Sequence, residues 1–400
     1  MPGPGEGWRA GAARRVVTPE PLLPVTAGAG ATRPATGKRG ELEVRVAVVE
    51  AGGTRVALVS MPFIGWPTWL CQRVQQAVQQ VPAAHVLIGA THTHGAPDVY
   101  GFLNEDGAYA VDVAYLEQVC RQTAELIDEA AAALAPATLY AATGPAQGKI
   151  AYNLYAPDLY DPRLNTLHAD AADGTRIFTL VNYAIHPEVL LRAPICTPDL
   201  VGPLYDCLDA AAGGCTLFLN GAQGGMVTAD IRTEDGGERE EWSECLRIGE
   251  ALCYEVLRIA SSAETLAPTL HCAGQPLTFP VKPPMQMMMQ TCHPDIRPHV
   301  PAAETYTVRQ NLVNFGAAQA LTIPGEALPN IGYYLKRNMR GRHNLLFGLT
   351  NDAIGYLLTR VDYDSFAAYD YITATSLGEE AGEILIAESL KLIAASPAPA

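Results

Sequence analysis

The sequence predicts a layered α/β fold. Short apolar runs with strand character alternate with longer segments in which apolar residues recur at helical intervals. Apolar residues make up 48% of the 400 positions and charged residues 17%, which is enough to bury a large core. No internal repeat and no long linker divides the chain, so we expect a single domain over residues 1–400.

The expected elements follow one another along the chain. The first two strands flank Ala51-Gly52-Gly53, a turn that glycine makes easy. Residues 85–90, 177–185 and 215–220 are short continuous apolar runs, typical of buried strands, and residues 112–134 form an Ala-rich amphipathic segment. The remaining strands are expected at 41–50, 54–61, 269–281, 305–323 and 345–349, and the remaining helices at 66–81, 240–263, 327–337 and 379–395.

Charge composition argues against two classes of partner, and the N-terminal residues and cysteines predict the cellular compartment. A formal net charge of −15 leaves no basic surface for nucleic acid or for an anionic membrane. The first seven residues lack the basic start and apolar run of a secretory signal, and no segment has the length and composition of a membrane span. Nine scattered cysteines without a CxxC pair predict reduced, mostly buried thiols, and hence a cytoplasmic protein.

Three polar motifs begin where a buried strand ends. They are Thr91-His92-Thr93-His94, His186-Pro187 and the glycine-rich segment 221–225. Strand ends in open α/β sheets are where ligands and catalytic groups collect. This placement predicts a functional site at the strand ends.

The residues in these motifs have both a chemical and a structural interpretation. Residues two apart in a strand face the same side, so His92 and His94 could address one site, or could be two partly exposed histidines. His186 could equally be a satisfied core histidine, and Glu326 the cap of the following helix. Tyr356 alone is typical of a packing residue. Two histidines, a carboxylate and an open position are what a catalytic zinc requires, but ligands this far apart in the sequence have no diagnostic spacing.

The ordered series of motifs resembles the neutral ceramidase family over residues 8–376. The motifs of the resemblance are Thr18-Pro19 after the first strand, 90–95 (Ala-Thr-His-Thr-His-Gly), 181–187 (Val-Asn-Tyr-Ala-Ile-His-Pro), 218–224 (Phe-Leu-Asn-Gly-Ala-Gln-Gly), 324–326 (Pro-Gly-Glu), 348–351 (Gly-Leu-Thr-Asn) and Gly355-Tyr356. The resemblance implies an α-β-β-α sandwich. Secreted ceramidases carry a C-terminal β-sandwich domain, which we do not expect here because the chain stops before one would begin.

The resemblance also implies a zinc site and a mechanism. Zinc would be held by His92, His186, Glu326 and Tyr356, and would activate water for attack on an amide. His94 would help protonate the departing amine. Tyr369 would bind the carbonyl or the oxyanion, with Tyr371 as the alternative candidate.

The chain departs from the family in the loop that grips the ceramide head group. Family members carry Gly-Asp-x-Ser-Pro or a relative of it, whereas this chain has Gly224-Gly225-Met226-Val227-Thr228. We expect Gly225, Val227, Thr228 and Tyr371 to contact the substrate, which would then differ from ceramide.

The expected function is therefore a zinc-dependent amidohydrolase acting on a small N-acyl compound in metabolism or natural-product biosynthesis. The alternatives are a zinc-dependent cyclase, a lactam- or ester-processing enzyme, and a non-catalytic binding protein. The methionine-rich segment 283–290 could be a loop that lines a pliable apolar pocket or a core-packing stretch between strands. A homo-oligomer is compatible with the sequence, which carries no signal of subunit number.

Overall fold

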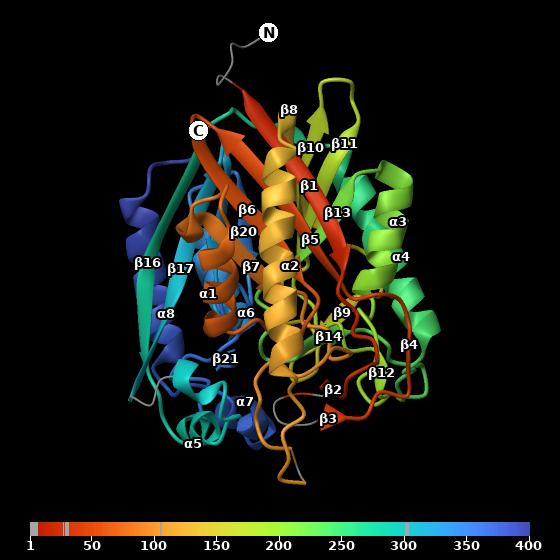
Figure 1. Cartoon of the computed structure of the whole chain (residues 1–400), viewed down its shortest axis with the longest axis vertical. Coiled ribbons are helices and arrows are strands. Elements are labelled where there is room, and N and C mark those ends of the chain that lie inside the picture. Colours follow the sequence, from red (N-terminus) through yellow and green to blue (C-terminus); the bar gives the residue numbers. More distant parts are fainter. Residues whose placement is uncertain (1–6, 27, 29–31, 105, 301–303) are drawn as a thin grey trace.

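Two β-sheets packed face to face form the centre of the molecule, and helices cover both outer faces (Figure 1). The computed structural model describes residues 7–26, 28, 32–104, 106–300 and 304–400. The prediction that the first seven residues are not a secretory signal falls mostly on residues 1–6, which lie outside the described residues. The first described strand begins at the end of the molecule where the C-terminus lies (Figure 1).

The larger sheet has nine strands in the order β13-β11-β10-β8-β1-β5-β6-β7, with β15 paired to β8. The second sheet has the order β16-β17-β18-β20. The bounds of the larger sheet's strands are β1 Trp8–Val16, β5 Glu43–Ala51, β6 Thr54–Met61, β7 Val86–Ala90, β8 Ala135–Pro145, β10 Arg163–Ala171, β11 Arg176–Tyr183, β13 Cys215–Asn220 and β15 Glu264–Thr265. Those of the second sheet are β16 Leu270–Pro280, β17 Thr305–Phe315, β18 Ala318–Thr322 and β20 His343–Phe347.

The helices and the short strands complete the structure. The helices are α1 Thr68–Ala77, α2 Val113–Ala132, α3 Val201–Ala212, α4 Trp242–Ala260, α5 Met285–Gln290, α6 Pro329–Asn338, α7 Asp370–Ala374 and α8 Ala381–Ala395. Three 3-10 turns cover Ala83–His85, Arg297–His299 and Ala367–Tyr369. The short strands are β2 Val25–Thr26, β3 Thr32–Arg33, β4 Gly37–Lys38, β9 Ala151–Asn153, β12 Ile195–Cys196, β14 Val227–Ala229, β19 Glu326–Ala327 and β21 Tyr356–Leu357.

Strand β5 shows why the apolar runs are continuous. Val46 and Val48 pack with α1 and α2, whereas Ala47 and Val49 face the second sheet. Because successive side chains point to opposite faces, a strand that is covered on both faces needs an apolar residue at nearly every position. The continuous apolar run is therefore a consequence of the layered architecture.

The helices form the two outer layers. α1, α2, α3 and α4 cover the outer face of the nine-stranded sheet, and α6 and α8 cover the outer face of the second sheet. Leu335 of α6 and Leu385 of α8 share a core with Leu321 and Leu346 of the second sheet. The molecule is thus the α-β-β-α sandwich that the sequence predicts.

Several predicted elements differ from the observed ones. The stretch 305–323 is two strands, β17 and β18, because the chain reverses at Gly316, whose φ of 54° suits glycine. β8 and β10 were not predicted, and β8 is rich in alanine and contains neither valine nor isoleucine. The segment 283–290 contains a short helix, α5, rather than being a loop throughout.

The prediction of uniformly reduced thiols is wrong for one pair. Cys207 of α3 and Cys253 of α4 form a disulfide, with 6.1 Å between their Cα atoms. The two helices pack side by side on the sheet, which brings together cysteines that lie 46 residues apart in the sequence. No local spacing could reveal such a pair. The remaining seven cysteines are free, and six of them are buried.

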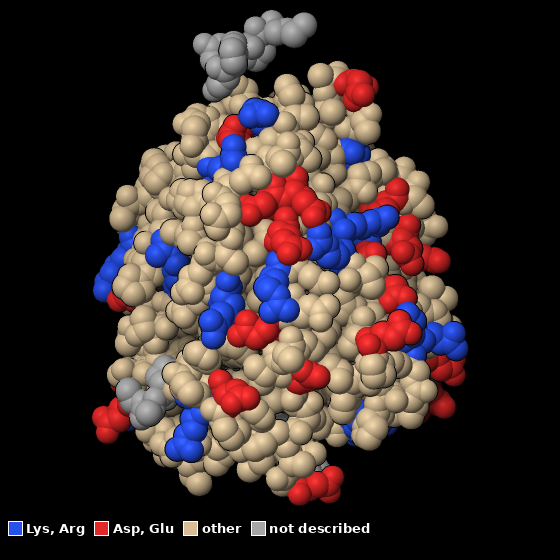
Figure 2. All heavy atoms as spheres, viewed as in Figure 1, with Lys and Arg blue, Asp and Glu red and all other residues tan. Residues whose placement is uncertain are grey.

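The surface carries charged side chains of both signs (Figure 2). Figure 2 shows acidic and basic side chains interspersed over the described part of the face that carries α1 and α2, without a continuous basic stripe. Within the described residues, none of the helices has both the length and the apolar character needed to cross a membrane.

Candidate metal centre

The ends of three strands of the larger sheet converge at one point. Asn220, the last residue of β13, donates from Nδ2 to the carbonyl oxygen of Thr91 at 3.2 Å and to that of Ile185 at 2.7 Å. Its side chain therefore joins the segment after β7 to the segment after β11. The two histidine motifs, far apart in the sequence, begin at this junction.

His92 is held by its backbone and by one ring nitrogen. Its amide donates to the carbonyl of Phe63 at 2.9 Å, and its Nδ1 hydrogen-bonds the carbonyl of Ile64. With a φ of 75°, His92 adopts the left-handed conformation, which is uncommon for a residue with a side chain. The prediction that His92 and His94 share the face of a strand is therefore wrong in its reason, since β7 ends at Ala90. The two rings nevertheless lie 5.0 Å apart.

His186 is held in a similar way. Its backbone amide and its Nδ1 both hydrogen-bond the carbonyl oxygen of Val227, each at 2.8 Å. Its Nε2 lies 3.1 Å from Oε2 of Glu326. The ring is therefore oriented by one main-chain oxygen and directed at one carboxylate.

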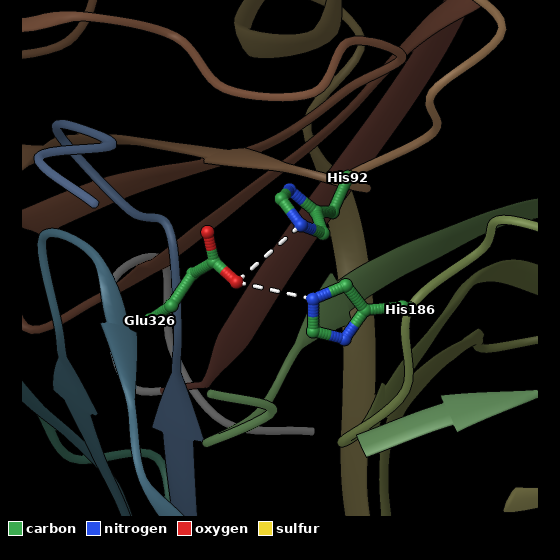
Figure 3. Close-up of side chains that lie close together, drawn as sticks. All are labelled: His92, His186 and Glu326. Carbon is green, nitrogen blue, oxygen red and sulfur yellow. Dashed lines mark hydrogen bonds and ion pairs between the residues drawn. The ribbon is translucent and has the colours of Figure 1, made fainter. Parts of the chain in front are cut away.

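Glu326 brings the cluster together. Its Oε2 lies 3.1 Å from Nε2 of His186 and 3.5 Å from Nε2 of His92 (Figure 3). One ligand atom from each of these residues lies within 4.8 Å of the others, and all three residues are buried. Glu326 belongs to β19, and the N-cap of α6 is Leu328, so the capping interpretation of Glu326 is wrong.

The donor set fits a divalent metal ion. A ring nitrogen that donates to a carbonyl carries a proton, which leaves Nε2 of His92 and His186 as the nitrogen that a metal ion can bind, with the ion displacing any proton shared with Glu326. Both Nε2 atoms are directed toward the Glu326 carboxylate. Histidine ligands in metal sites have this arrangement, with the second ring nitrogen fixed by a backbone carbonyl or a carboxylate. The cluster therefore has the chemistry of a two-histidine, one-carboxylate site.

The pKa values at the cluster reflect burial and mutual interaction. Burial lowers the pKa of His92 to about 4, against the attraction of Glu326. Burial would also lower the pKa of His186, but the charges of Glu188 and Glu326 and the hydrogen bond to Glu326 raise it to about 9. Burial would raise the pKa of Glu326, but the two imidazoles lower it to about 2. The carboxylate is therefore ionised at neutral pH.

His94 lies beside the cluster without belonging to it. Its ring centroid is 5.0 Å from that of His92 and 6.3 Å from that of His186. Neither ring nitrogen has a hydrogen-bond partner among the described residues, although Nε2 lies 3.9 Å from Oε2 of Glu188. Burial lowers the pKa of His94 to about 3. A neutral imidazole with nitrogens available for a ligand therefore lines the cavity.

The three tyrosines singled out in the sequence occupy different places. The Tyr356 ring lines the cavity, and its hydroxyl hydrogen-bonds Sδ of Met226 at 3.2 Å. Tyr371 also lines the cavity, with 6.0 Å between its ring and that of Tyr356. Tyr369 packs instead against Tyr155 and is not among the residues that line the cavity.

The Gly224–Thr228 loop lies behind the cluster. Gly225, Val227 and Thr228 do not line the cavity, and the Val227 carbonyl orients His186. A Cβ on Gly224 would lie 2.2 Å from the backbone oxygen of Glu326. The loop that the sequence assigned to substrate contact therefore supports two members of the cluster.

The cavity in front of the cluster is mostly apolar. Met285 and Met289 of α5 lie in its wall, so the pocket interpretation of the methionine-rich segment agrees with the structure. Several further lining residues carried no functional signal in the sequence, because they come from separate elements, which include α1, β17 and several loops. These are Ile64, Pro67, Trp69, Tyr100, Phe102, Ile296, Val300, Tyr306, residues 352–354 and Thr375.

The fold is that of neutral ceramidases. A crystal structure of neutral ceramidase from Pseudomonas aeruginosa superimposes with a TM-score of 0.78 and 16% identity, covering 98% of this chain and 76% of the ceramidase. A ceramidase structure described as complexed with C2 also gives 0.78 and 16%, covering 97% and 75%. No family model and no curated protein matches the sequence. The resemblance seen in the motifs is confirmed as a shared fold.

Proposed function

We propose that this chain is a zinc-dependent hydrolase that cleaves the amide bond of a small N-acyl substrate. The observation that carries the proposal is the convergence of Nε2 of His92, Nε2 of His186 and a Glu326 carboxylate oxygen within 4.8 Å of one another, with His92 and Glu326 in the wall of an apolar cavity. The fold is shared with ceramidases, whose name refers to the cleavage of ceramide, an amide. This supports the same reaction class.

The side chains around the cavity have distinct roles in this proposal. When bound, zinc supplies Lewis acidity to the scissile carbonyl and lowers the pKa of water. His92, His186 and Glu326 hold the ion, and Tyr356 is the fourth ligand. His94 moves a proton from the attacking water to the departing amine nitrogen as the C–N bond breaks. Tyr371 positions the carbonyl oxygen, because it lines the cavity and Tyr369 does not.

The loop supports a substrate other than ceramide. Gly224 to Thr228 lacks the acid and the serine of the family, and it packs behind the metal ligands instead of facing the cavity. The cavity walls from α5 and from the Trp69 and Tyr100 segments then determine which amide is bound. We also propose that the protein acts in the cytoplasm, which the seven free cysteines support and the Cys207–Cys253 disulfide does not.

Hydrolysis in heavy-oxygen water tests the reaction class. The zinc-loaded protein is incubated with a panel of N-acyl amides, and the acid products are analysed by mass spectrometry. Hydrolysis incorporates one labelled oxygen into each carboxylate. Turnover without label would instead support a cyclase or another acyl transfer, and a protein that binds no zinc would contradict the proposal.

A further inference from the structure

Asp352 is a buried carboxylate on the wall of the cavity that the proposed chemistry does not use. Its Oδ2 accepts hydrogen bonds from Thr68 Oγ1 and, at 2.8 Å, from the Tyr306 hydroxyl. Its Oδ1 accepts one from the Ala353 amide at 2.6 Å. The Thr68 amide also hydrogen-bonds the carboxylate, and all four of these donors are neutral. The charge is therefore hydrogen-bonded but not neutralised.

This environment distinguishes Asp352 from most other buried acids. Among the described residues, five buried carboxylates have a lysine, arginine or histidine nitrogen within 4.0 Å: Asp161, Glu188, Asp230, Glu244 and Glu326. Three have none: Asp98, Asp199 and Asp352. Asp98 and Asp199 accept backbone amides and do not line the cavity. Asp352 is the member of this group that a ligand in the cavity can reach.

The rest of the cavity wall is also suited to a positive charge. No lysine or arginine lines it, in the part of the chain that the structure describes. Six aromatic side chains do: Trp69, Tyr100, Phe102, Tyr306, Tyr356 and Tyr371. Aromatic faces attract cations, and an unpaired buried carboxylate is strongly stabilised by one. An anionic ligand would gain neither interaction.

We propose that Asp352 binds the ammonium group of an apolar substrate, so that the cavity selects amides with a cationic substituent over neutral ones. The inference rests on the proposed function in that the cavity is taken as the substrate pocket. Binding to Asp352 itself requires no hydrolysis, so the two proposals can be tested separately. Burial raises the pKa of Asp352 to about 6, so the group is ionised in mildly alkaline buffer.

Calorimetry with a matched pair of ligands tests the inference. The probes are a phenylalkyl trimethylammonium ion, which cannot coordinate zinc, and its uncharged tert-butyl isostere, each added to the zinc-loaded protein. We expect the cation to bind about tenfold more tightly, as a desolvated ion pair with aromatic contacts would give. In Asp352→Asn we expect this preference to disappear.

Asp98→Asn is the matched control, because it removes a buried unpaired carboxylate that lies outside the cavity wall. It should keep the preference. Equal binding of the two probes by the unmodified protein, or an unchanged preference in Asp352→Asn, would overturn the inference. If Asp352→Asn does not fold, the comparison in the unmodified protein decides alone. If the protein hydrolyses amides but shows no preference for the cationic probe, only the Asp352 inference is refuted. If it prefers the cationic probe but hydrolyses no amide, the proposed function fails and the Asp352 inference stands.

Discussion

Two pairs of buried histidines in this chain differ in what surrounds their rings. Nε2 of His92 and Nε2 of His186 both approach one carboxylate. In the sheets, His168 stacks on Tyr140 with 5.0 Å between ring centroids, and its Nδ1 has no hydrogen-bond partner among the described residues. His343 bonds Thr143 through Nδ1, and its Nε2 lies 3.9 Å from the half-exposed Glu264. Burial is common to both pairs.

This contrast indicates that convergence on one carboxylate, rather than burial, distinguishes a candidate metal ligand from a packed histidine. Each ring of the first pair has one nitrogen fixed by a main-chain carbonyl, so the other nitrogen has a defined direction. The ring nitrogens of His168 and His343 do not approach a shared group. Substitutions in each histidine pair, at His94, in the supporting loop and at the two tyrosines test this contrast.

Removal of each histidine pair should give the largest contrast. The double variant His92→Ala, His186→Ala should lose nearly all of its zinc, which we expect at about one ion per chain in the unmodified protein. The matched variant His168→Ala, His343→Ala should retain it, although it loses core packing. Elemental analysis of the purified proteins measures both. Equal zinc in the two variants would remove the distinction between the pairs.

His94→Gln should separate proton transfer from metal binding. His94 lies beside the cluster but does not share the Glu326 carboxylate, so zinc content should be unchanged. We expect kcat to fall about 100-fold, the usual scale for loss of a general acid or base. Steady-state kinetics at saturating zinc measure this. Loss of the metal would make His94 a ligand, and an unchanged kcat would exclude a proton-transfer role.

Gly224→Ala should weaken the cluster without altering a ligand. The new methyl group would lie 2.2 Å from the backbone oxygen of Glu326, so the strand that carries the carboxylate must move. We expect about tenfold weaker zinc binding, as for other changes in groups that orient ligands, and about 1–3 kcal/mol lower stability from overpacking. Zinc titration and thermal unfolding measure these effects.

Gly37→Ala provides the control for this substitution, because a Cβ there meets no atom within 4 Å. It should change neither zinc affinity nor Tm. Similar behaviour of the two alanine variants would show that the Gly224 contact is not what positions Glu326.

The smallest effects should distinguish the two candidate tyrosines. Tyr371→Phe should lower kcat/KM several-fold to about tenfold, since the lost hydroxyl lies on the cavity wall. Tyr369→Phe should change it less than about twofold, because the ring packs against Tyr155 and Phe366 outside the cavity wall. The opposite order would restore Tyr369 to the substrate site.

The sequence predicts much of this fold because burial on both faces leaves a strong pattern. The strands 54–61 and 215–220 have the predicted bounds, since each is built on an apolar core, residues 56–59 in the first and 217–219 in the second. β8 was missed because it is rich in alanine, begins and ends near a proline and contains neither valine nor isoleucine. The local sequence pattern could not predict the Cys207–Cys253 disulfide either, because that bond depends on how α3 and α4 pack.

The three residues of the candidate metal cluster were predictable from the sequence, but their geometry was not. The strand-end motifs and the family resemblance identified His92, His186 and Glu326, yet the direction of each ring depends on main-chain oxygens distant in sequence. The role of the loop depends on the same tertiary contacts. No motif pointed to Asp352, because what distinguishes it is a tertiary feature, a buried carboxylate with only neutral hydrogen-bond donors.

Anomalous scattering at the zinc edge from crystals of the zinc-loaded protein tests the central claim most directly. We expect one strong peak per chain, with His92 Nε2, His186 Nε2 and a Glu326 oxygen each at about 2.0–2.2 Å from the ion. A peak at another site, or zinc-loaded crystals with no peak between these three side chains, would contradict the assignment of a metal centre.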